Sequence, residues 1–346
     1  MKGKKIMFVG DSLSLNQWQS LTCMLHAAVP QSNFTLQRKG DLSTFYFQDY
    51  NISLMLFRNA FLVDLVKEKM GRILKLDSIQ NGNSWKGFDM LIFNTWHWWL
   101  HKGSAKTWDY IQKGDKLYKD MDRLIAFNEG LKTWSKWVDS NIDPSHTKVF
   151  FQAVSPTHYN GAEWNATKGT TCNHETQPIT GSTYPGGPPP AVVVVKGVLS
   201  NMSTAVGLLD VTQLSQLRKD GHPSIYGIDG QNGNDCSHWC LAGLPGWYYK
   251  SQKKYYRRKI EWARPCLLPQ PVQREILQML MELGKVVPQE WYACAHVVNF
   301  ENLKTKEVVY EVVERDITQL VIQFHDKLGN MCEGNTRDKW FHYLLL

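Results

Sequence analysis

The chain opens with a short apolar run followed by a helical repeat of apolar positions. Lys4–Val9 is apolar and ends in Gly10-Asp11-Ser12, which predicts a buried strand and a tight turn. Apolar side chains then recur every three or four residues until Pro30, which predicts an amphipathic helix. The N-terminal segment therefore predicts a strand, a turn and a helix, and the apolar positions of the helix are Leu15, Trp18, Leu21, Leu25 and Ala28.

Two more apolar runs predict further buried strands. They are Phe88–Asn94 and Lys148–Val154, and the amphipathic segment Met121–Val138 between them predicts a helix. Strands that alternate with helices favour an α/β fold, in which helices cover both faces of a central parallel sheet.

Active sites in such folds lie outside the carboxyl ends of the strands. Gly10-Asp11-Ser12, Asn94 and Ser155 each stand at or just after the end of a predicted strand. We therefore expect these residues to meet at one edge of the sheet.

The middle of the chain gives a weaker pattern. Residues 172–190 are rich in Pro and Gly and predict a long loop. Ala191–Leu217 has both helical and mixed character, and Val192–Val195 within it is β-prone, so both interpretations stay open.

The composition changes again after Trp247. A basic run and several prolines lead into two apolar repeats, Val272–Leu283 and Lys306–Leu328, that predict helices. We therefore expect a catalytic domain over residues 1–247, a basic, Pro-containing linker over 248–265 and a mainly helical appendage over 266–346.

The composition excludes several classes of protein. Of the 346 residues, 43% are apolar and 21% are charged, which excludes wholesale disorder. No window reaches the roughly 18 consecutive apolar residues of a membrane span, and the start shows no signal peptide. The net charge of +7 includes one dense basic run, Lys253–Lys259. We interpret it as a solvated linker and expect no nucleic-acid partner, because no nucleic-acid-binding module accompanies it.

Seven cysteines and four N-glycosylation sequons together favour the secretory pathway. Cys236 and Cys240 have no second metal-like pair elsewhere, so we predict no metal site. The candidate glycosylation sites are Asn33, Asn51, Asn165 and Asn201.

The 14 tryptophans allow two interpretations. Clusters such as Trp96, Trp98 and Trp99 favour positions in the core, whereas exposed indoles would stack on sugar rings. The first interpretation predicts buried side chains and the second predicts accessible ones.

Two distant motifs carry the candidate chemistry. A strand-to-helix turn at Gly10-Asp11-Ser12 would project the Ser12 hydroxyl above the sheet, where backbone N–H groups can hold an oxyanion. A serine nucleophile needs a base, and the base needs a carboxylate that fixes its tautomer. Asp235 and His238 are three residues apart and supply both groups. Serine early and Asp-x-x-His late is the distribution expected of an SGNH/GDSL-type hydrolase.

The longer sequence around these motifs resembles the plant trichome-birefringence-like family, whose members include xylan O-acetyltransferases. The resemblance covers residues 1 to about 247 and implies an SGNH/GDSL-like three-layer fold. The segments that carry it are Phe8–Trp18, Phe45–Asn51, Phe57–Val63, Phe93–Trp99 and Asp235–Leu241.

The resemblance implies a Golgi lumenal enzyme that transfers acetyl groups to hydroxyls of a cell-wall polysaccharide, with xylan as the expected substrate. Ser12 matches the acyl-accepting nucleophile, His238 its general base and Asp235 the orienting acid. Gly10 and Asn94 match the oxyanion site, and Asn94 satisfying a strand-end turn is the alternative. No bound cofactor is implied. The acetyl donor stays open between acetyl-CoA and an acetylated intermediate, supplied directly or by a membrane protein.

The resemblance also implies a disulfide between Cys172 and Cys240. Cys23 and Cys236 would pair with cysteines of a family segment that this sequence lacks, so we expect both to be unpaired. The family's N-terminal anchor is missing as well, and roughly a hundred residues follow its last motif. A truncated or fused gene would explain these departures.

Three functions remain in competition. The first is O-acetyl transfer through Ser12, and the second is acetylester hydrolysis, in which water replaces the sugar hydroxyl. The third is a non-catalytic wall-polysaccharide binder that uses Trp96, Trp98, Trp99 and Trp164. Arg58, within one of the matching segments, is a further candidate for glycan binding.

Overall fold

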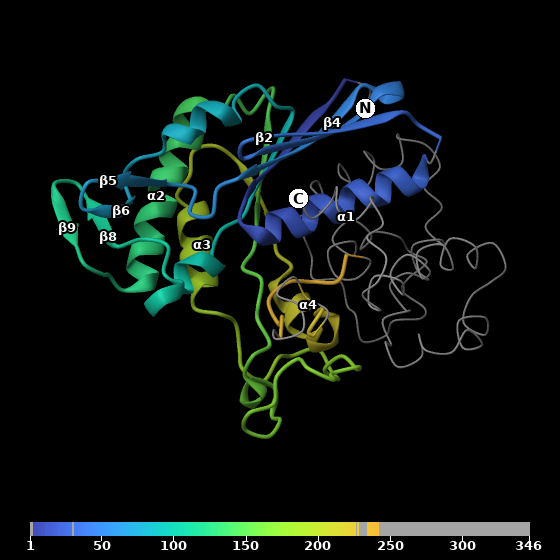
Figure 1. The fold of residues 1–346 in the computed structure, drawn as a ribbon, viewed down its shortest axis with the longest axis vertical. Helices are drawn as coiled ribbons and strands as arrows, with labels where there is room; N and C mark the ends of the chain where they lie inside the picture. The colour runs from blue at the N-terminus through green and yellow to red at the C-terminus, as the bar shows by residue number, and fades with distance from the viewer. Residues whose placement is uncertain (1–2, 30, 226, 228–233, 242–346) are drawn as a thin grey trace.

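The computed structural model describes residues 3–29, 31–225, 227 and 234–241. A seven-stranded sheet runs through the molecule (Figure 1). Its strands are β1 (Lys5–Gly10), β2 (Phe34–Lys39), β3 (Leu42–Phe47), β4 (Ile52–Arg58), β7 (Met90–Phe93), β10 (Lys148–Gln152) and β11 (Val206–Leu209). Their spatial order is β11-β10-β7-β1-β4-β3-β2.

Five of these strands are parallel, which confirms the predicted parallel sheet over its larger part. β11, β10, β7, β1 and β4 all run in the same direction, while β3 is antiparallel to both β4 and β2. The departure has a local cause, because strands joined by only a few residues pair as antiparallel hairpins. Gly40 and Asn51 make the two turns with left-handed backbones, at φ 58° and 52°. The sequence analysis did not predict these hairpins.

Helices cover both faces of the sheet, so the three-layer arrangement is present. Helix α1 (Ser12–Ala28) lies on one face, and α2 (Arg123–Asn141) and α3 (Ala191–Leu199) lie on the other (Figure 1). Alternate residues of β1 belong to the two layers, with Ile6 and Phe8 packed on the α1 side. The short helix α4 (Thr212–Gln216) follows β11.

Helix α3 resolves the segment that the sequence left open. Four β-branched residues, Val192–Val195, lie inside it. Ala191, Val192, Val195 and Val198 recur at helical spacing and are buried against the core. Burial of this stripe therefore outweighs the β-propensity of the valines.

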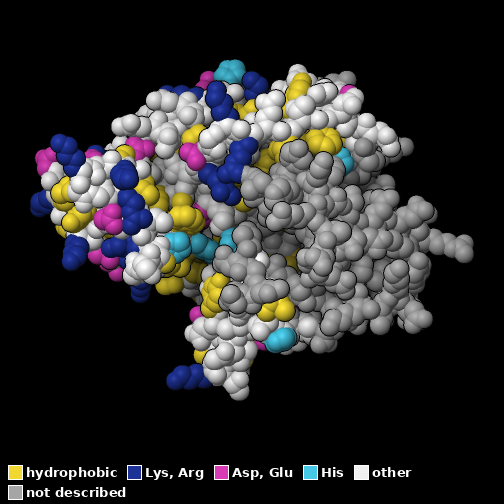
Figure 2. Space-filling model, viewed as in Figure 1, with side chains coloured by type: hydrophobic (Ala, Val, Ile, Leu, Met, Phe, Trp, Pro, Cys, Tyr) yellow, Lys and Arg dark blue, Asp and Glu magenta, His cyan; other side chains and the backbone are white. Residues whose placement is uncertain are grey.

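A second, four-stranded sheet was not predicted. Its strands are β5 (Asp64–Glu68), β6 (Gly71–Lys75), β8 (Tyr110–Lys113) and β9 (Lys116–Tyr118), in the order β5-β6-β8-β9. Lys, Arg, Asp and Glu side chains intermix on the surface over these strands (Figure 2), and Lys75 pairs with Glu68 at 2.7 Å. The remaining elements are short 3₁₀ helices at Gln48–Tyr50, Gln80–Trp85, His97–Leu100, Gly103–Ala105, Gly161–Trp164 and Lys219–Gly221.

The tryptophans mostly build the core. Trp85, Trp108 and Trp134 are fully buried, and Trp85 meets Phe93 edge-to-face at 5.4 Å between ring centroids. Such aromatic pairs add to the stabilisation from burial.

The prediction of glycan stacking is therefore wrong for three of the four tryptophans proposed for it. Trp96, Trp99 and Trp164 are only 7%, 1% and 8% exposed. Trp98 is half-buried and packs against the same core. Trp96 and Trp99 pack against Phe127 of α2, and Trp164 packs against His158, so the faces of these indoles are not open to a sugar.

The described residues include no helix that is both long and apolar enough to cross a membrane. The predicted linker at 248–265 and the predicted helical appendage at 266–346 lie outside the described residues.

Candidate active site

The turn between β1 and α1 presents Ser12 at the carboxyl edge of the sheet. Asp11 caps the helix, because its Oδ1 accepts a hydrogen bond from the Leu13 N–H at 2.9 Å. Ser12 is the first helical residue and is partly exposed. The helix N-terminus beside it favours negative charge. The predicted strand–turn–helix is therefore present, with Ser12 at its apex.

Gly10 lets the end of β7 approach this turn. A Cβ atom at Gly10 would lie 2.2 Å from the Asn94 carbonyl oxygen and 2.4 Å from the Ser14 Oγ. The Asn94 N–H donates to the Val9 carbonyl, so Asn94 also secures the end of the strand pair. Its side chain is 2% exposed, and within the described part of the chain its Oδ1 has no hydrogen-bond donor. Asn94 thus lies beside the Ser12 turn, at the edge where it was expected.

Asp235 and His238 form a close ion pair in a segment without regular secondary structure. His238 Nδ1 lies 2.8 Å from Asp235 Oδ2. Because a carboxylate only accepts, Nδ1 carries the proton and Nε2 is the basic nitrogen. The Ser237 hydroxyl is on the Nδ1 side, at 3.4 Å. The geometry therefore aims Nε2, and not Nδ1, at any nucleophile.

The local backbone holds the Asp235 carboxylate in place. Its Oδ1 accepts from the N–H groups of Ser237 and His238, at 3.1 and 3.0 Å. Burial acts to raise the pKa of Asp235, but the hydrogen bonds and the charge of His238 prevail and hold it well below its usual range. The carboxylate is thus ionised at neutral pH and can orient the imidazole.

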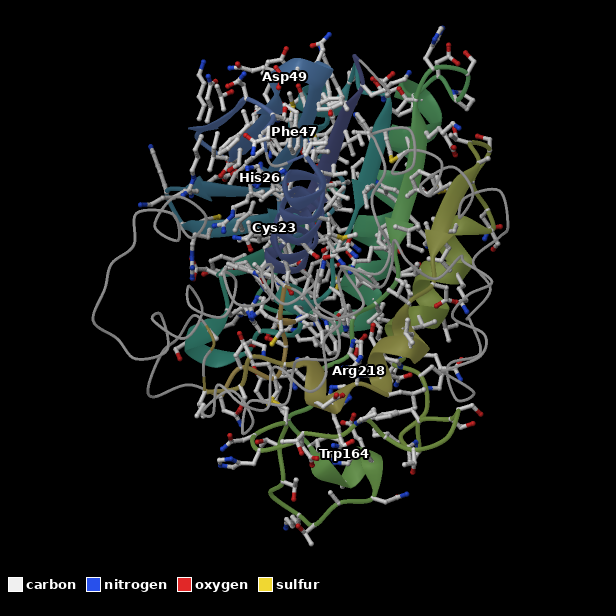
Figure 3. All side chains as sticks on the ribbon, turned by 90° about the vertical axis from the view of Figure 1, so that its right-hand side faces the viewer. Cys23, His26, Phe47, Asp49, Trp164 and Arg218 are labelled. Carbon is white, nitrogen blue, oxygen red and sulfur yellow. A yellow bond between two sulfur atoms is a disulfide. The ribbon has the colours of Figure 1, made fainter. Side chains whose placement is uncertain are left out.

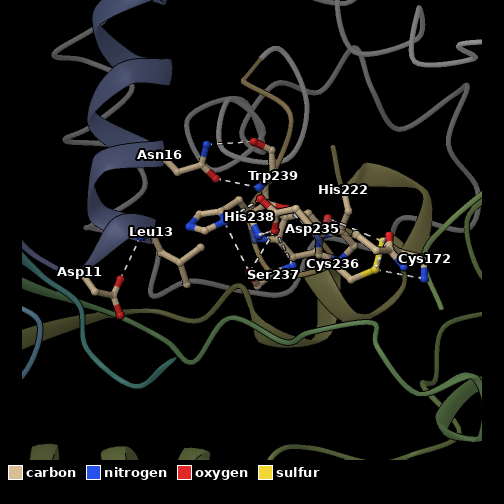
Figure 4. Close-up of polar contacts among 11 residues, drawn as sticks. Asp11, Leu13, Asn16, Cys172, His222, Asp235, Cys236, Ser237, His238 and Trp239 are labelled. Carbon is tan, nitrogen blue, oxygen red and sulfur yellow. Dashed lines mark hydrogen bonds and ion pairs between the residues drawn. A yellow bond between two sulfur atoms is a disulfide. The ribbon is translucent and has the colours of Figure 1, made fainter. Parts of the chain in front are cut away.

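Long-range hydrogen bonds bring this segment to the start of α1 (Figure 4). The Asn16 side chain donates to the Trp239 carbonyl and accepts from the Trp239 N–H, both at 2.8 Å. Asn16 is four residues after Ser12, so both side chains lie on the same face of the helix. His238, the neighbour of Trp239, is thereby fixed near the first turn of α1.

Ser155 connects the same segment to the 3₁₀ turn that follows β7. Its Oγ accepts from the Trp239 indole N–H at 2.9 Å, and its carbonyl accepts from His97 Nε2 at 2.9 Å. Ser155 thus lies at the predicted edge and joins two parts of the site.

Asp11 and His97 complete the electrostatics of the site. Burial raises the pKa of Asp11, although electrostatic interactions with His97 and His238 oppose the shift. Burial lowers the pKa of His97, so its imidazole is neutral at pH 7, and nearby Asp11 opposes that shift. These mutual effects show that Asp11, His97 and His238 lie in one electrostatic neighbourhood.

The predicted disulfide is wrong in its second cysteine. Cys172 is bonded to Cys236, with 5.6 Å between the Cα atoms, and within the described part of the chain Cys240 and Cys23 form no disulfide. The backbone of His158 explains the choice, because its N–H donates to the Cys236 carbonyl and its carbonyl accepts from the Cys172 N–H. His158 therefore aligns Cys172 with Cys236, and the expectation that Cys236 is unpaired is also wrong.

The free thiols do not resemble reactive groups. Burial raises the pKa of Cys23 to about 11 and that of Cys240 to about 12, which disfavours the thiolate. Cys23 projects from α1, far from the loops that hold Trp164 (Figure 3). The Cys240 N–H donates to the Gly221 carbonyl, which directs this residue away from the disulfide.

The other predicted residues occupy different parts of the surface. Arg58 ends β4, is paired in register with Gly10 and is exposed, so it lies beside the Ser12 turn. The four predicted glycosylation sites are all exposed, and they are Asn33, Asn51, Asn165 and Asn201. Among the described residues, no group of three or more His, Cys, Asp or Glu side chains is arranged to hold a metal ion.

Sequence reasoning did not assign roles to Asn16, His97 or Ser155 within the site. Asn16 and His97 stand inside two of the motifs already singled out, and Ser155 was noted only as a strand-end residue. Their roles depend on contacts with residues that are distant in sequence. Asn16 and Ser155 both form hydrogen bonds with Trp239, which lies more than 80 positions from each of them. A local pattern carries no signal for such contacts.

Comparison with known proteins agrees with this geometry. Residues 1–249 match the PC-Esterase family, described as a GDSL/SGNH-like acyl-esterase family found in Pmr5 and Cas1p. Residues 246–316 match a different family, the second POTRA domain of Toc75-like proteins.

Curated relatives come from Arabidopsis thaliana. Protein trichome birefringence-like 38 is 56% identical over 245 residues, which are 70% of this chain and 64% of the relative. Protein trichome birefringence-like 42 is 58% identical over 245 residues, covering 70% of this chain and 68% of the relative. Protein trichome birefringence is 37% identical, covering 71% of this chain and 44% of the relative. The chain thus spans about two thirds or less of the length of these relatives.

Proposed function

The chain belongs to the PC-esterase family of GDSL/SGNH-like acyl-esterases, and on that basis we propose that it transfers acetyl groups through a covalent intermediate on Ser12. The proposed acceptor is a hydroxyl group of a plant cell-wall polysaccharide, with xylan as the first substrate to test. The proposed location is the Golgi lumen, in line with the secretory character of the four exposed sequons.

In the first half of the proposed reaction, His238 Nε2 takes the proton from the Ser12 hydroxyl. The Ser12 oxygen then attacks the acetyl carbonyl, and backbone N–H groups at the start of α1 stabilise the oxyanion, with Asn94 alongside. Collapse of this intermediate expels the donor's leaving group, which receives the proton from His238. The products are the acetylated Ser12 and the free donor.

In the second half, the acceptor hydroxyl gives its proton to His238 Nε2 and attacks the acetyl-Ser12 carbonyl. The Ser12 oxygen leaves and regains the proton, which restores the enzyme. Asp235 stays ionised throughout and stabilises the positive imidazolium of His238.

One observation carries this proposal. The paired hydrogen bonds between Asn16 and Trp239 join two segments 223 residues apart, and they support the proposal because Trp239 is the neighbour of His238 and Asn16 belongs to the helix that begins with Ser12. Neither motif alone would justify a catalytic role.

The proposal is tested by mass spectrometry of the full chain after reaction with 4-nitrophenyl acetate, a simple acetyl donor. We expect one acetyl group on Ser12 and none in the Ser12→Ala variant. Ser237→Ala is the matched control, because it removes the other hydroxyl close to His238 but leaves its Nε2 side unchanged. An adduct that persists in Ser12→Ala, or that is lost only in Ser237→Ala, would contradict the assignment.

Hydrolysis is the second candidate function. In this reaction water replaces the acceptor hydroxyl, and the His238 side chain is 24% exposed although its Nε2 atom is covered. Partition of labelled acetyl from acetyl-Ser12 between xylan oligosaccharides and water distinguishes the two reactions. Transfer predicts acetylated oligosaccharide as the main product, and hydrolysis predicts labelled acetate even when the oligosaccharide is in excess.

A further inference from the structure

Two buried histidines contact each other directly behind the Asp235–His238 segment. His158 and His222 are 0% and 5% exposed, and His158 Nδ1 lies 2.7 Å from His222 Nε2. His158 follows β10 in the chain, and His222 follows the 3₁₀ turn Lys219–Gly221. Neither residue has a part in the proposed acetyl-transfer steps.

The outer nitrogens of both rings face backbone carbonyls. His158 Nε2 lies 2.9 Å from the Gln216 carbonyl, and His222 Nδ1 lies 2.6 Å from the His238 carbonyl. A carbonyl only accepts, so each of these ring nitrogens must carry a proton.

A neutral imidazole carries only one N–H proton, and here both protons are on the outer nitrogens. The two facing nitrogens, His158 Nδ1 and His222 Nε2, therefore carry none. Two neutral imidazoles with protonated outer nitrogens would point lone pairs at each other across 2.7 Å. A third proton between His158 Nδ1 and His222 Nε2 removes this conflict and completes three hydrogen bonds. The observed arrangement therefore fits three protons on four ring nitrogens, and hence one positive charge on the pair.

We infer that His158 and His222 bind one shared proton, and that in this form they act as positioning residues for His238. The second half of this inference rests on the proposed function of His238, whereas the proton count does not.

The pair is connected to the His238 segment at three points. His222 donates to the His238 carbonyl, and its ring stacks on Trp239 with 4.0 Å between centroids and an interplanar angle of 24°. The His158 N–H donates to the Cys236 carbonyl at 3.0 Å. The pair thus contacts residues on both sides of the proposed base, and a shift in its rings would move the His238 backbone.

Several charged groups act on this pair from the surrounding elements. Asp220 favours a proton on His158, and Lys219 opposes it. For His222, Asp235 favours the proton, while His97 opposes it. The further groups are in ion pairs or hydrogen bonds of their own, namely Arg218 with Asp220, Lys219 with Glu175, and Tyr184 with Glu163.

Burial sets the direction of the titration. It opposes any charge on the pair, because it lowers the pKa of His158 to about 4 and that of His222 well below its usual range. The hydrogen bond between the facing nitrogens opposes this effect for one shared proton only, so the pair does not hold a second charge. The single proton is favoured at acidic pH and is released as the pH rises. Once it leaves, one ring must give up a carbonyl partner, and the anchor on His238 is weakened. We therefore expect the His238 segment to be best positioned at acidic pH.

The proton count is measured by ¹⁵N NMR of histidine side chains in the full chain, assigned with His158→Gln and His222→Gln. At pH 5 we expect three protonated nitrogens in the pair, and at pH 8 we expect two. Two protonated nitrogens throughout this range would overturn the inference. Because the count does not depend on catalysis, it is decided even if Ser12 proves not to be the nucleophile.

The positioning role is tested by the rate at which a fluorophosphonate probe labels Ser12 between pH 5 and pH 8. His158→Gln is the informative variant, because its amide N–H can donate to His222 Nε2 without any added proton. We expect its rate to equal the wild-type rate at pH 5 and to exceed it severalfold at pH 8.

His158→Leu is the control that removes the partner. We expect it to lower the labelling rate about tenfold at every pH, as a misplaced catalytic group does. A His158→Gln to wild-type ratio that stays constant with pH would show a merely structural role and would overturn the positioning claim. If the wild-type chain is not labelled at Ser12, the proposed function fails, and the NMR result still decides the proton count.

Discussion

The two halves of the proposed active site are built by different means. Ser12 stands between a strand of the central sheet and a helix, so regular hydrogen bonding fixes its position. Asp235 and His238 belong to a segment without helix or strand, which is held by side-chain hydrogen bonds and by one disulfide. Ser12 is therefore placed by local structure, and His238 is placed by distant parts of the chain.

This contrast predicts unequal sensitivity to change. Strand and helix ladders share their stability over many residues, so the Ser12 half should tolerate loss of single contacts. The His238 half depends on a few contacts, and each of them carries a larger share of the positioning. Substitutions can therefore separate the two halves.

The largest effect is expected from removal of the disulfide. The double variant Cys172→Ala/Cys236→Ala frees a loop whose ends are 64 residues apart in sequence. We expect the free energy of unfolding to fall by about 4 kcal/mol, through the entropy of the unfolded chain. Thermal denaturation followed by near-ultraviolet circular dichroism measures the loss.

The control for this pair is Cys23→Ala, which removes a half-buried cysteine that forms no disulfide among the described residues. We expect the double variant to lose Ser12 labelling at temperatures where the sheet is still folded. Simultaneous loss of labelling and fold would show that the two halves are not separable.

Gly10→Ala is expected to have the second-largest effect, and it acts on the Ser12 half of the site. The new Cβ would meet the Asn94 carbonyl oxygen at 2.2 Å, so the strand ends would have to separate. We expect a loss of about 3 kcal/mol in unfolding free energy, measured by urea denaturation. Gly197→Ala is the control, since it lies in α3 with open space around it and should be neutral or slightly stabilising. Equal effects of the two substitutions would rule out the close approach at Gly10.

Asn16→Ala tests the connection between the halves. It removes two buried hydrogen bonds to Trp239 and leaves both backbone groups without their partner. We expect a loss of about 2 kcal/mol in stability and a larger fall in Ser12 labelling than the stability change explains. Asn141→Ala, which removes one hydrogen bond within α2, is the matched control. Unchanged labelling in Asn16→Ala would contradict the role given to this contact.

The smallest effect is expected for Asp11→Asn. Burial raises the folded-state pKa of Asp11 above its ordinary value of 3.8, so the folded protein binds this proton more tightly than the unfolded chain. The free energy of unfolding therefore falls as the pH rises through the folded pKa. Asn keeps the helix cap and removes the buried charge, so we expect a slightly higher melting temperature at pH 7.

The pH dependence distinguishes this explanation from a general effect of the substitution. The gain should shrink as the pH is lowered towards 4, where Asp11 is itself protonated. A gain that is the same at both pH values would contradict it.

The sequence predicted the parts of the molecule that local pattern determines. The apolar run before Gly10 and the helical repeat after Ser12 gave the first strand and helix close to their observed bounds. The hairpins of β2 and β3 were missed, because Phe34–Lys39 alternates weakly and has mostly exposed or half-buried side chains. The valines of α3 remained ambiguous for a related reason, since only packing against the core decides between helix and strand.

The candidate site was predicted less completely. Ser12, Asp235 and His238 were identified by residue type and order, and the structure brings the elements that carry them together. The disulfide was misassigned because the family resemblance does not show which cysteine the backbone of His158 aligns with Cys172. The indoles of Trp96 and Trp99 were open to two interpretations, and burial decided between them.

The Asn16–Trp239 contact also has a consequence for the order of events during synthesis. Asn16 leaves the ribosome 223 residues before its partner, which at roughly 5–20 residues per second is on the order of ten to forty seconds. Throughout this interval the nascent chain can already form its first helix, but it has no base beside Ser12. A chain interrupted before residue 235 would therefore contain the proposed nucleophile in an inert form, so that catalytic competence would arise only near the end of translation of this domain.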